Sequence, residues 1–171
     1  MRIAGALTIL AVATLTGATA VASSSRRVPV VPCDDDIAWS KSGDDGGWRI
    51  VLGVVSVPAA HLRQVVATHI RPWAYWRKAG LSVHAGQGPV SASVATAWRS
   101  RVAITWGNNV GPVSSLRIAR CTVQWPGKAW NGYAGGFFLR SRSACVPLIV
   151  RVAERSRIVR FGIGRKCRAG G

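Results

Sequence analysis

The sequence predicts an all-β protein: an antiparallel β-sandwich, immunoglobulin-like or jelly-roll-like, with at most one short helix. Two observations favour this fold class. The apolar runs after residue 47 are short, and in several of them apolar and polar residues alternate, as in strands that bury one face. Clusters of Gly, Pro, Asn and Ser separate these runs, which is typical of turns between antiparallel strands.

Residues 1–22 have the pattern of a secretory signal peptide. Arg2 precedes an apolar, alanine-rich run, and small residues offer cleavage after Ala20 or Ala22. An uncleaved membrane anchor is the alternative, but threonines and Gly17 interrupt the run, and no comparable apolar run follows. We therefore expect a secreted or cell-envelope-associated chain with no transmembrane segment after cleavage.

Residues 23–47 are polar and hold five of the six acidic residues of the chain, namely Asp34, Asp35, Asp36, Asp44 and Asp45. This composition predicts an extended acidic arm, tethered by Cys33, that lies on the basic body and partly neutralises it. Residues 48–171 are long enough for one domain with its own core, which we expect to be the β-sandwich.

The domain begins with a continuous apolar run that predicts one strand near 48–57. Residues 59–70 carry Leu62, Val65, Val66 and His69 at helical spacing, which favours a short helix and is the one good helix candidate. Seven further runs bring the expected number of strands to between seven and nine: 80–86, 89–98, 99–107, 113–121, 135–142, 146–152 and 157–164.

The last two runs predict a hairpin. Pairing 152 with 159, 150 with 161 and 148 with 163 keeps the apolar residues on one face and leaves Arg155-Ser156 as the loop. This register places Arg151 directly opposite Arg160, an unfavourable pair that a bridging anion would stabilise. The simpler interpretation is that both side chains extend into water, where salt screens the repulsion between their charges.

Four cysteines in an exported chain predict two disulfides, and the sequence permits three connectivities. The hairpin brings Cys145 and Cys167 to its open end, one residue out of register, so a bulge would be needed to join them. With that provision we predict Cys145–Cys167, which leaves Cys33–Cys121 to staple the arm to the body.

Three segments resemble a group of uncharacterised small exported actinobacterial proteins with a C-terminal cysteine-containing β-hairpin: "WAYWRKAGLSVHAG", "VSSLRIARC" and "WNGYAGGFFLRSRSACVPLIVRV…VRFGIGRKC". The likeness covers roughly 48–168, in its cysteine, tryptophan and glycine pattern. It implies export and the class of protein, and it brings no known activity.

The charge of the chain is strongly positive, at +17, and from Gly46 onward 19 cations face Glu154 alone. Such a body attracts anionic polymers or membrane surfaces, although a genomic bias toward arginine codons would also produce it. Arginines interleaved with apolar residues in successive strands should project from one outer sheet face. The candidate ligand-binding cations are Arg140, Arg151, Arg157, Arg160, Arg165 and Lys166.

Aromatic residues offer a second contact surface. Most of the eight tryptophans must be core, because eight exposed ones would promote aggregation. The segment "RPWAYWRKAG", 71–80, favours a packed corner over a sugar-stacking platform. The glycine-rich loop with Trp125, Trp130 and Tyr133 is the better place for exposed rings.

Motifs for catalysis and cofactors are weak. His61, His69 and His84 lack flanking carboxylates and metal-ligand spacing, no cysteines form a C-x-x-C pair, and the aspartates lack a calcium-loop pattern. We therefore expect no metal and no cofactor. A spatial triad with a serine would still be compatible with a small secreted hydrolase.

The function that the sequence favours is a non-enzymatic, monomeric, exported domain that binds anionic or glycan polymers of the cell envelope and no specific nucleic acid. The alternatives are a carbohydrate-binding module that uses loop aromatics, a structural or protein-interaction domain, and the hydrolase.

Overall fold

The computed structural model describes residues 27–37, 47–59 and 61–168. The signal-peptide prediction and the aspartates at 44 and 45 lie outside these ranges. The described chain is all-β, with three mostly antiparallel sheets and two short 3-10 turns, η1 (Cys33–Asp35) and η2 (Thr96–Trp98). The predicted fold class, a β-sandwich-like protein, is confirmed.

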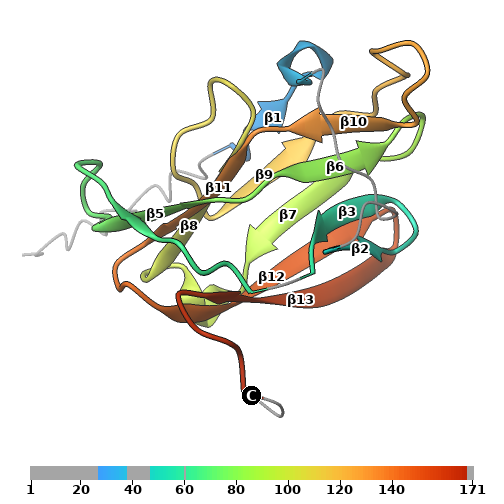
Figure 1. The fold of residues 1–171 in the computed structure, drawn as a ribbon. Coiled ribbons are helices and arrows are strands. Elements are labelled where there is room, and N and C mark those ends of the chain that lie inside the picture. Colours follow the sequence, from blue (N-terminus) through green and yellow to red (C-terminus); the bar gives the residue numbers. More distant parts are fainter. Residues whose placement is uncertain (1–26, 38–46, 60, 169–171) are drawn as a thin grey trace, which may run out of the picture.

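The largest sheet has five strands and carries the C-terminal hairpin (Figure 1). Its strands, in spatial order, are β1 (Val30–Val31), β9 (Ser115–Ile118), β7 (Val90–Val94), β12 (Ala144–Val152) and β13 (Arg155–Ile163). β1 pairs in parallel with β9, and all other pairs are antiparallel. The N-terminal segment thus forms one edge of this sheet and β13 forms the other.

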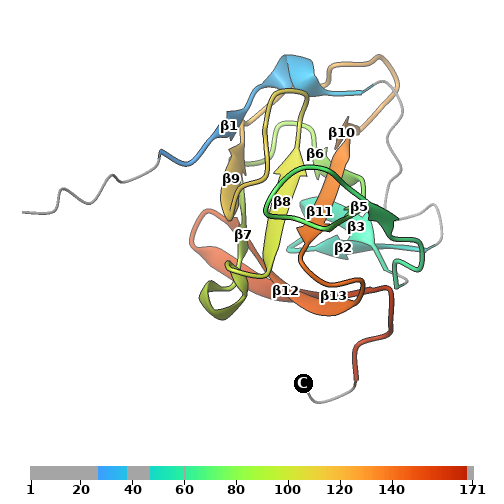
Figure 2. The same cartoon turned by 90° about the vertical axis from the view of Figure 1, so that its left-hand side faces the viewer.

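Two four-stranded sheets complete the fold. The first contains β10 (Trp130–Tyr133), β6 (Leu81–His84), β3 (Val55–Pro58) and β2 (Trp48–Val51). The second contains β4 (Val66–Ala67), β5 (Tyr75–Lys78), β11 (Gly135–Leu139) and β8 (Val102–Trp106). Figure 2 shows the β12–β13 hairpin passing beneath the strands of the other sheets.

One apolar core joins the three sheets. The Phe137 ring of β11 lies 5.0 Å from the Phe161 ring of β13 and 5.8 Å from the Trp106 ring of β8, measured between centroids. Trp106 is 1% exposed, and its indole N–H donates to the Ala79 carbonyl at 2.9 Å, so the buried polar atom is paired. In β7, Val90, Ala92 and Val94 are buried with half-buried serines between them, as the alternation predicts.

The register of the C-terminal hairpin differs from the predicted one. Val152 pairs with Arg155, Val150 with Arg157 and Leu148 with Val159, so the two-residue turn is Ala153-Glu154. Each residue of β12 therefore pairs with a residue four positions earlier in β13 than predicted, and the turn lies two residues earlier in the chain. Because the shift in pairing is even, Leu148, Val150, Val152, Val159, Phe161 and Ile163 are still buried on one face, as predicted.

Two predicted elements are wrong. The run 48–57 is not one strand but two, since the chain reverses at Leu52-Gly53 to form the β2–β3 hairpin. Residues 61–70 contain no helix. Instead, Leu62 bridges Ile163 at the free edge of β13, with its N–H on the Gly162 carbonyl at 2.8 Å, and β4 pairs with β5.

Both predicted disulfides are present. Cys33–Cys121 joins η1 to the segment after β9, and Cys145–Cys167 joins β12 to the C-terminal tail, residues 164–168. Cys145 pairs directly with Gly162, so β13 needs no bulge: the tail itself folds back over the strand end to bring Cys167 close.

Candidate functional site

A cleft lies on the outer face of the five-stranded sheet, where the C-terminal tail crosses the end of the β12–β13 hairpin. Its volume is about 510 Å³. Pro147 and Arg160 are paired across the two strands at its floor, and Cys145 is the next outward-facing residue of β12. We call this the C-terminal cleft; its described lining residues are Trp98, Cys145, Pro147, Arg160, Arg165, Lys166 and Arg168.

The tail forms one wall of the cleft because three features hold it there. The chain turns after β13 at Gly164, whose φ of +66° favours glycine. Gly162 lets the tail approach: a Cβ there would lie 2.5 Å from the Arg165 carbonyl oxygen. The Cys145–Cys167 bond then fixes the tail to β12, which places Arg165, Lys166 and Arg168 around the opening.

The opposite wall comes from η2. Pro147 has no N–H to continue the ladder with β7, and the chain leaves β7 at Val94. The Ala95 N–H still donates to the Pro147 carbonyl at 3.2 Å, and the following 3-10 turn carries Trp98. The Arg101 guanidinium carbon lies 4.4 Å from the Trp98 ring centroid, a cation–π contact that holds the indole in place.

The cleft is electrostatically one-sided. Four of its described lining residues are cations and none is a carboxylate. Glu154 lies at the turn of the hairpin, six residues from Arg160, which is roughly 20 Å along the strand. Cations held together without counter-charges repel one another, and a bound anion makes the same arrangement favourable.

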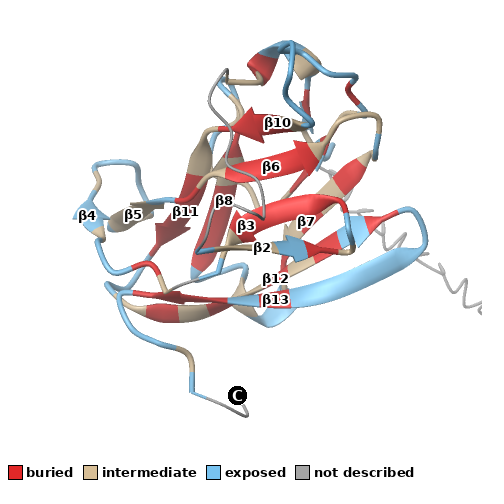
Figure 3. Ribbon diagram, turned by 45° about the vertical axis from the view of Figure 1, so that its right-hand side comes forward, coloured by how far each residue is buried: buried red, intermediate tan, exposed pale blue. Residues whose placement is uncertain are grey.

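Of the predicted cations, the structure brings Arg160, Arg165 and Lys166 together in this cleft. The predicted Arg151/Arg160 pair is wrong, since Arg151 lies opposite Ser156 and Ser91. Figure 3 shows how exposed the turn half of β13 is.

The remaining predicted cations lie elsewhere. Arg157 pairs with Val150, whose side chain is buried, so Arg157 leaves the sheet on the face opposite to Arg160. Arg140 is an exposed residue just after β11, in a different sheet. Neither lines the C-terminal cleft in the part of the chain that the structure describes.

The predicted aromatic loop lies at the other end of the molecule, next to β10, whereas the tail descends below β13 (Figures 1 and 2). Trp125 is 43% exposed, and the half-buried Trp130 ring makes an edge contact with His84 at 5.1 Å between centroids. Tyr133 is 1% exposed, so its ring belongs to the core. The prediction that Tyr133 offers an exposed ring to a ligand is therefore wrong. The residues 71–80 form the half-buried strand β5 and its approach, with Trp76 packed on Phe138.

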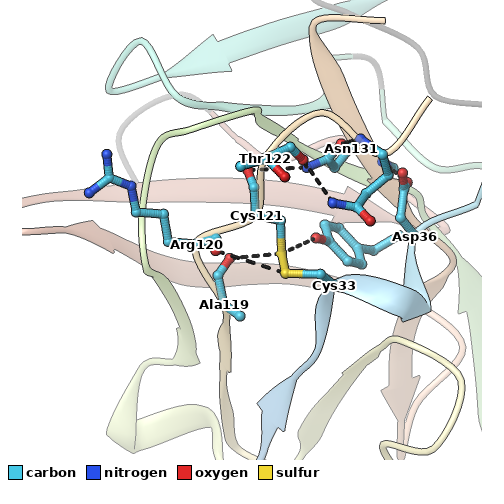
Figure 4. The surroundings of a disulfide bond; sticks show 10 residues. Cys33, Asp36, Ala119, Arg120, Cys121, Thr122 and Asn131 are labelled. Carbon is cyan, nitrogen blue, oxygen red and sulfur yellow. Dashed lines mark hydrogen bonds between the residues drawn. A yellow bond between two sulfur atoms is a disulfide. The ribbon is translucent and has the colours of Figure 1, made fainter. Parts of the chain in front are cut away.

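Two of the three described acidic residues of the arm, Asp35 and Asp36, accept hydrogen bonds from backbone amides. The Asp35 carboxylate accepts from the Asn108 N–H at 2.9 Å, and Asp36 accepts from the Gly132 N–H. Burial raises the pKa of the Asp36 carboxyl, while the Gly132 hydrogen bond opposes that rise. Asp36 lies near the Cys33–Cys121 disulfide and Asn131 (Figure 4), and η1 is at the opposite end of the molecule from the tail.

Trp98, Arg168 and Arg49 of the cationic surface were not among the predicted site residues, although Arg168 directly follows Cys167 in the same tail as Arg165 and Lys166. Trp98 lines the C-terminal cleft, and Arg49 of β2 lines a neighbouring pocket of about 410 Å³. The signal for Trp98 was local, since arginines follow it at 99 and 101 in the sequence. Arg49 gave no signal, because its contact with β13 spans 111 residues.

In comparisons with known proteins, no protein-family model, no curated protein and no solved structure matches this chain. Within residues 27–37, 47–59 and 61–168, none of the helical segments has the length and apolar character needed to cross a bilayer. The same ranges hold no group of three or more His, Cys, Asp or Glu side chains suited to a metal ion.

Proposed function

We propose that this chain is an exported binding domain, without catalytic activity, that associates with an anionic polymer of the cell envelope through the C-terminal cleft. One observation carries the proposal: four cations and an indole surround a single cleft whose described lining has no carboxylate. Two disulfides support export, because such bonds persist outside the reducing cytosol.

The chemistry of the cleft favours anionic groups on a carrier with apolar surface. Arg160, Arg165 and Arg168 supply guanidinium groups, which bind phosphate, sulfate and carboxylate oxygens through paired N–H donors. Trp98 adds apolar surface to the lining, which a sugar or alditol carbon skeleton could contact.

The proposal is tested with two variants that remove the same charge. Arg165→Ser/Arg168→Ser removes two cations of the cleft, and Arg117→Ser/Arg151→Ser removes two exposed cations of the same outer sheet face that do not line it. Sedimentation of the oxidised mature protein with native and polyanion-stripped cell walls, over a salt series, measures association.

Wild-type binding should fall with salt and disappear on stripped walls, because screening weakens contacts between exposed charges. The cleft variant should bind about 10-fold more weakly, whereas the control should change only as its net charge does. Equal losses in the two variants would reduce the effect to bulk charge and refute the role of the cleft. Retention on stripped walls at high salt would favour an aromatic, glycan-binding mode.

A further inference from the structure

A second pocket, which we call the Arg49 pocket, lies on the other side of β13 from the C-terminal cleft. Arg49 projects from β2 and is half-buried. Its Nη2 donates to the Arg160 carbonyl at 2.9 Å, and its guanidinium carbon lies 5.5 Å from the Phe161 ring centroid. These contacts fix the plane and position of the guanidinium against the edge of β13.

The guanidinium keeps unused capacity to donate. Its Nε is buried and has no hydrogen-bond partner among the described residues. Burial lowers the pKa of Arg49, which shows that the surroundings disfavour its charge. A partly buried cation without a counter-charge is unfavourable, and an oxyanion in the pocket would supply that counter-charge.

The surroundings of Arg49 are open and cationic. The pocket of about 410 Å³ is bounded by small or rigid residues, among them Pro58, Ala59 and Gly162. Its other titratable side chains are His61, Arg63, Arg160 and Lys166, and its described lining holds no carboxylate. Donors supplied by two strands, by residues 61–63 and by the C-terminal tail suit a tetrahedral oxyanion with acceptor oxygens on every side better than a planar carboxylate.

The two cavities are neighbours, because Arg160 and Lys166 line both of them. A chain with regularly spaced anionic groups could therefore place one group in each cavity as it crosses the end of β13. Binding at two linked positions raises affinity well above that of either position alone.

We propose that the Arg49 pocket is a seat for one phosphate or sulfate group, and that the seat and the C-terminal cleft take successive anionic groups of one polymer. The second half rests on the proposed function; the seat itself does not.

The test begins with single ions. Binding of inorganic phosphate and of sulfate to the oxidised mature protein is measured by calorimetry at constant ionic strength. Arg49→Gln is compared with Arg77→Gln, a matched control in which a half-buried arginine with an unpartnered Nε lines no described cavity. We expect Arg49→Gln to weaken the binding of the preferred ion about 10-fold or more, because a charged hydrogen-bonding group is lost, and Arg77→Gln to change it less than about 2-fold.

Equal effects of the two substitutions, or no saturable binding of either ion, would overturn the seat. If Arg49→Gln fails to fold, Arg49→Lys keeps the charge but loses the paired donors, so it should still weaken binding several-fold. Wild-type affinity in Arg49→Lys would also overturn the seat. The preference between phosphate and sulfate identifies the class of polymer.

The test continues with long-chain polyphosphate and dextran sulfate. The wild-type protein should bind the preferred polymer at least about 100-fold more tightly than the single ion, and both Arg49→Gln and Arg165→Ser/Arg168→Ser should lose most of that gain. Polymer affinity unchanged in Arg49→Gln would overturn the shared polymer and leave the cleft standing. Polymer affinity unchanged in the cleft variant, with the single-ion effect intact, would refute the proposed function and leave the seat standing.

Discussion

Replacing Gly162 with alanine should push the C-terminal tail away from β13 and so disrupt the C-terminal cleft, without changing the charge of the chain. A Cβ at this position would lie 2.5 Å from the Arg165 carbonyl oxygen and 3.0 Å from the Cys167 nitrogen. Both are backbone atoms, so no side-chain rotation relieves the contact. Because non-bonded atoms prefer separations of about 3.5 Å or more, the tail must retreat by roughly 1 Å.

The magnitude follows from this overpacking. Extra atoms forced into a packed site cost about 1–3 kcal/mol of stability. For a domain of this size that lowers the unfolding midpoint by about 3–10 °C. If the displacement removes two or three tail cations from a polyanion, the slope of log affinity against log salt falls by about 1.4–2.1, taking the value for single-stranded nucleic acids.

Thermal unfolding and polyphosphate binding over a salt series measure the two effects. The control is Gly53→Ala, at the β2–β3 turn, where a Cβ meets nothing within 4 Å and the φ of +72° alone makes the substitution unfavourable. It should lose stability but keep the wild-type salt slope. The reasoning is wrong if Gly162→Ala also keeps that slope and affinity.

Two further predictions concern stability. Removing Cys33–Cys121, which closes 88 residues, should cost about 4.6 kcal/mol of stability, and removing Cys145–Cys167, which closes 22, should cost about 3.4 kcal/mol. In calorimetry, the variant with both Cys33 and Cys121 replaced by serine should therefore unfold at a lower temperature than the variant with both Cys145 and Cys167 replaced. The reverse order would contradict the loop-entropy argument. Because burial raises the folded-state pKa of Asp36 above its ordinary value of 3.8, the folded protein binds that proton more tightly than the unfolded chain. Its protonation therefore stabilises the fold fully below pH 3.8, and this stability is lost as the pH rises through the folded pKa. Unfolding midpoints measured from pH 3 to 7 should show this loss in the wild-type protein and lack it in Asp36→Asn. Parallel pH profiles of the two proteins would contradict the role of Asp36.

Alternation in the sequence predicted which face of each C-terminal strand is buried but not how the strands align. A four-residue shift in the pairing keeps every side chain on the same face, so the apolar pattern is satisfied equally by both registers. Only the turn separates them, and it falls at Ala153-Glu154, where Ala153 takes a φ of +49°. Neither residue is a typical residue of a two-residue hairpin turn.

The other errors have related causes. Leu52 has a φ of +56° in the β2–β3 turn. Leucine rarely adopts this conformation, so a leucine within a continuous apolar run does not indicate a turn. The apolar spacing at 59–70 is compatible with a helix, but long-range pairing prevails, because the Leu62 backbone forms hydrogen bonds with Gly162 and Gly164.

The candidate site was predictable only where it is local in sequence. Arg160, Arg165 and Lys166 lie within seven residues of Cys167, so a disulfide at the open end of a hairpin was enough to bring them together. Trp98, in the turn η2, and Arg49, in β2, line the two neighbouring cavities although both are far from the tail in sequence. No periodicity within one segment reports such a meeting.

If the proposed function holds, the fastening of the tail makes the affinity for polyanions depend on the redox state of the compartment. In a reducing cytosol the Cys145–Cys167 bond is absent, and Arg165, Lys166 and Arg168 are carried on an untethered chain end. The cleft is then incomplete while the nascent chain is still among nucleic acids, the most abundant polyanions there. Under the same proposal, oxidation after export would complete the cleft where the proposed envelope polymer lies.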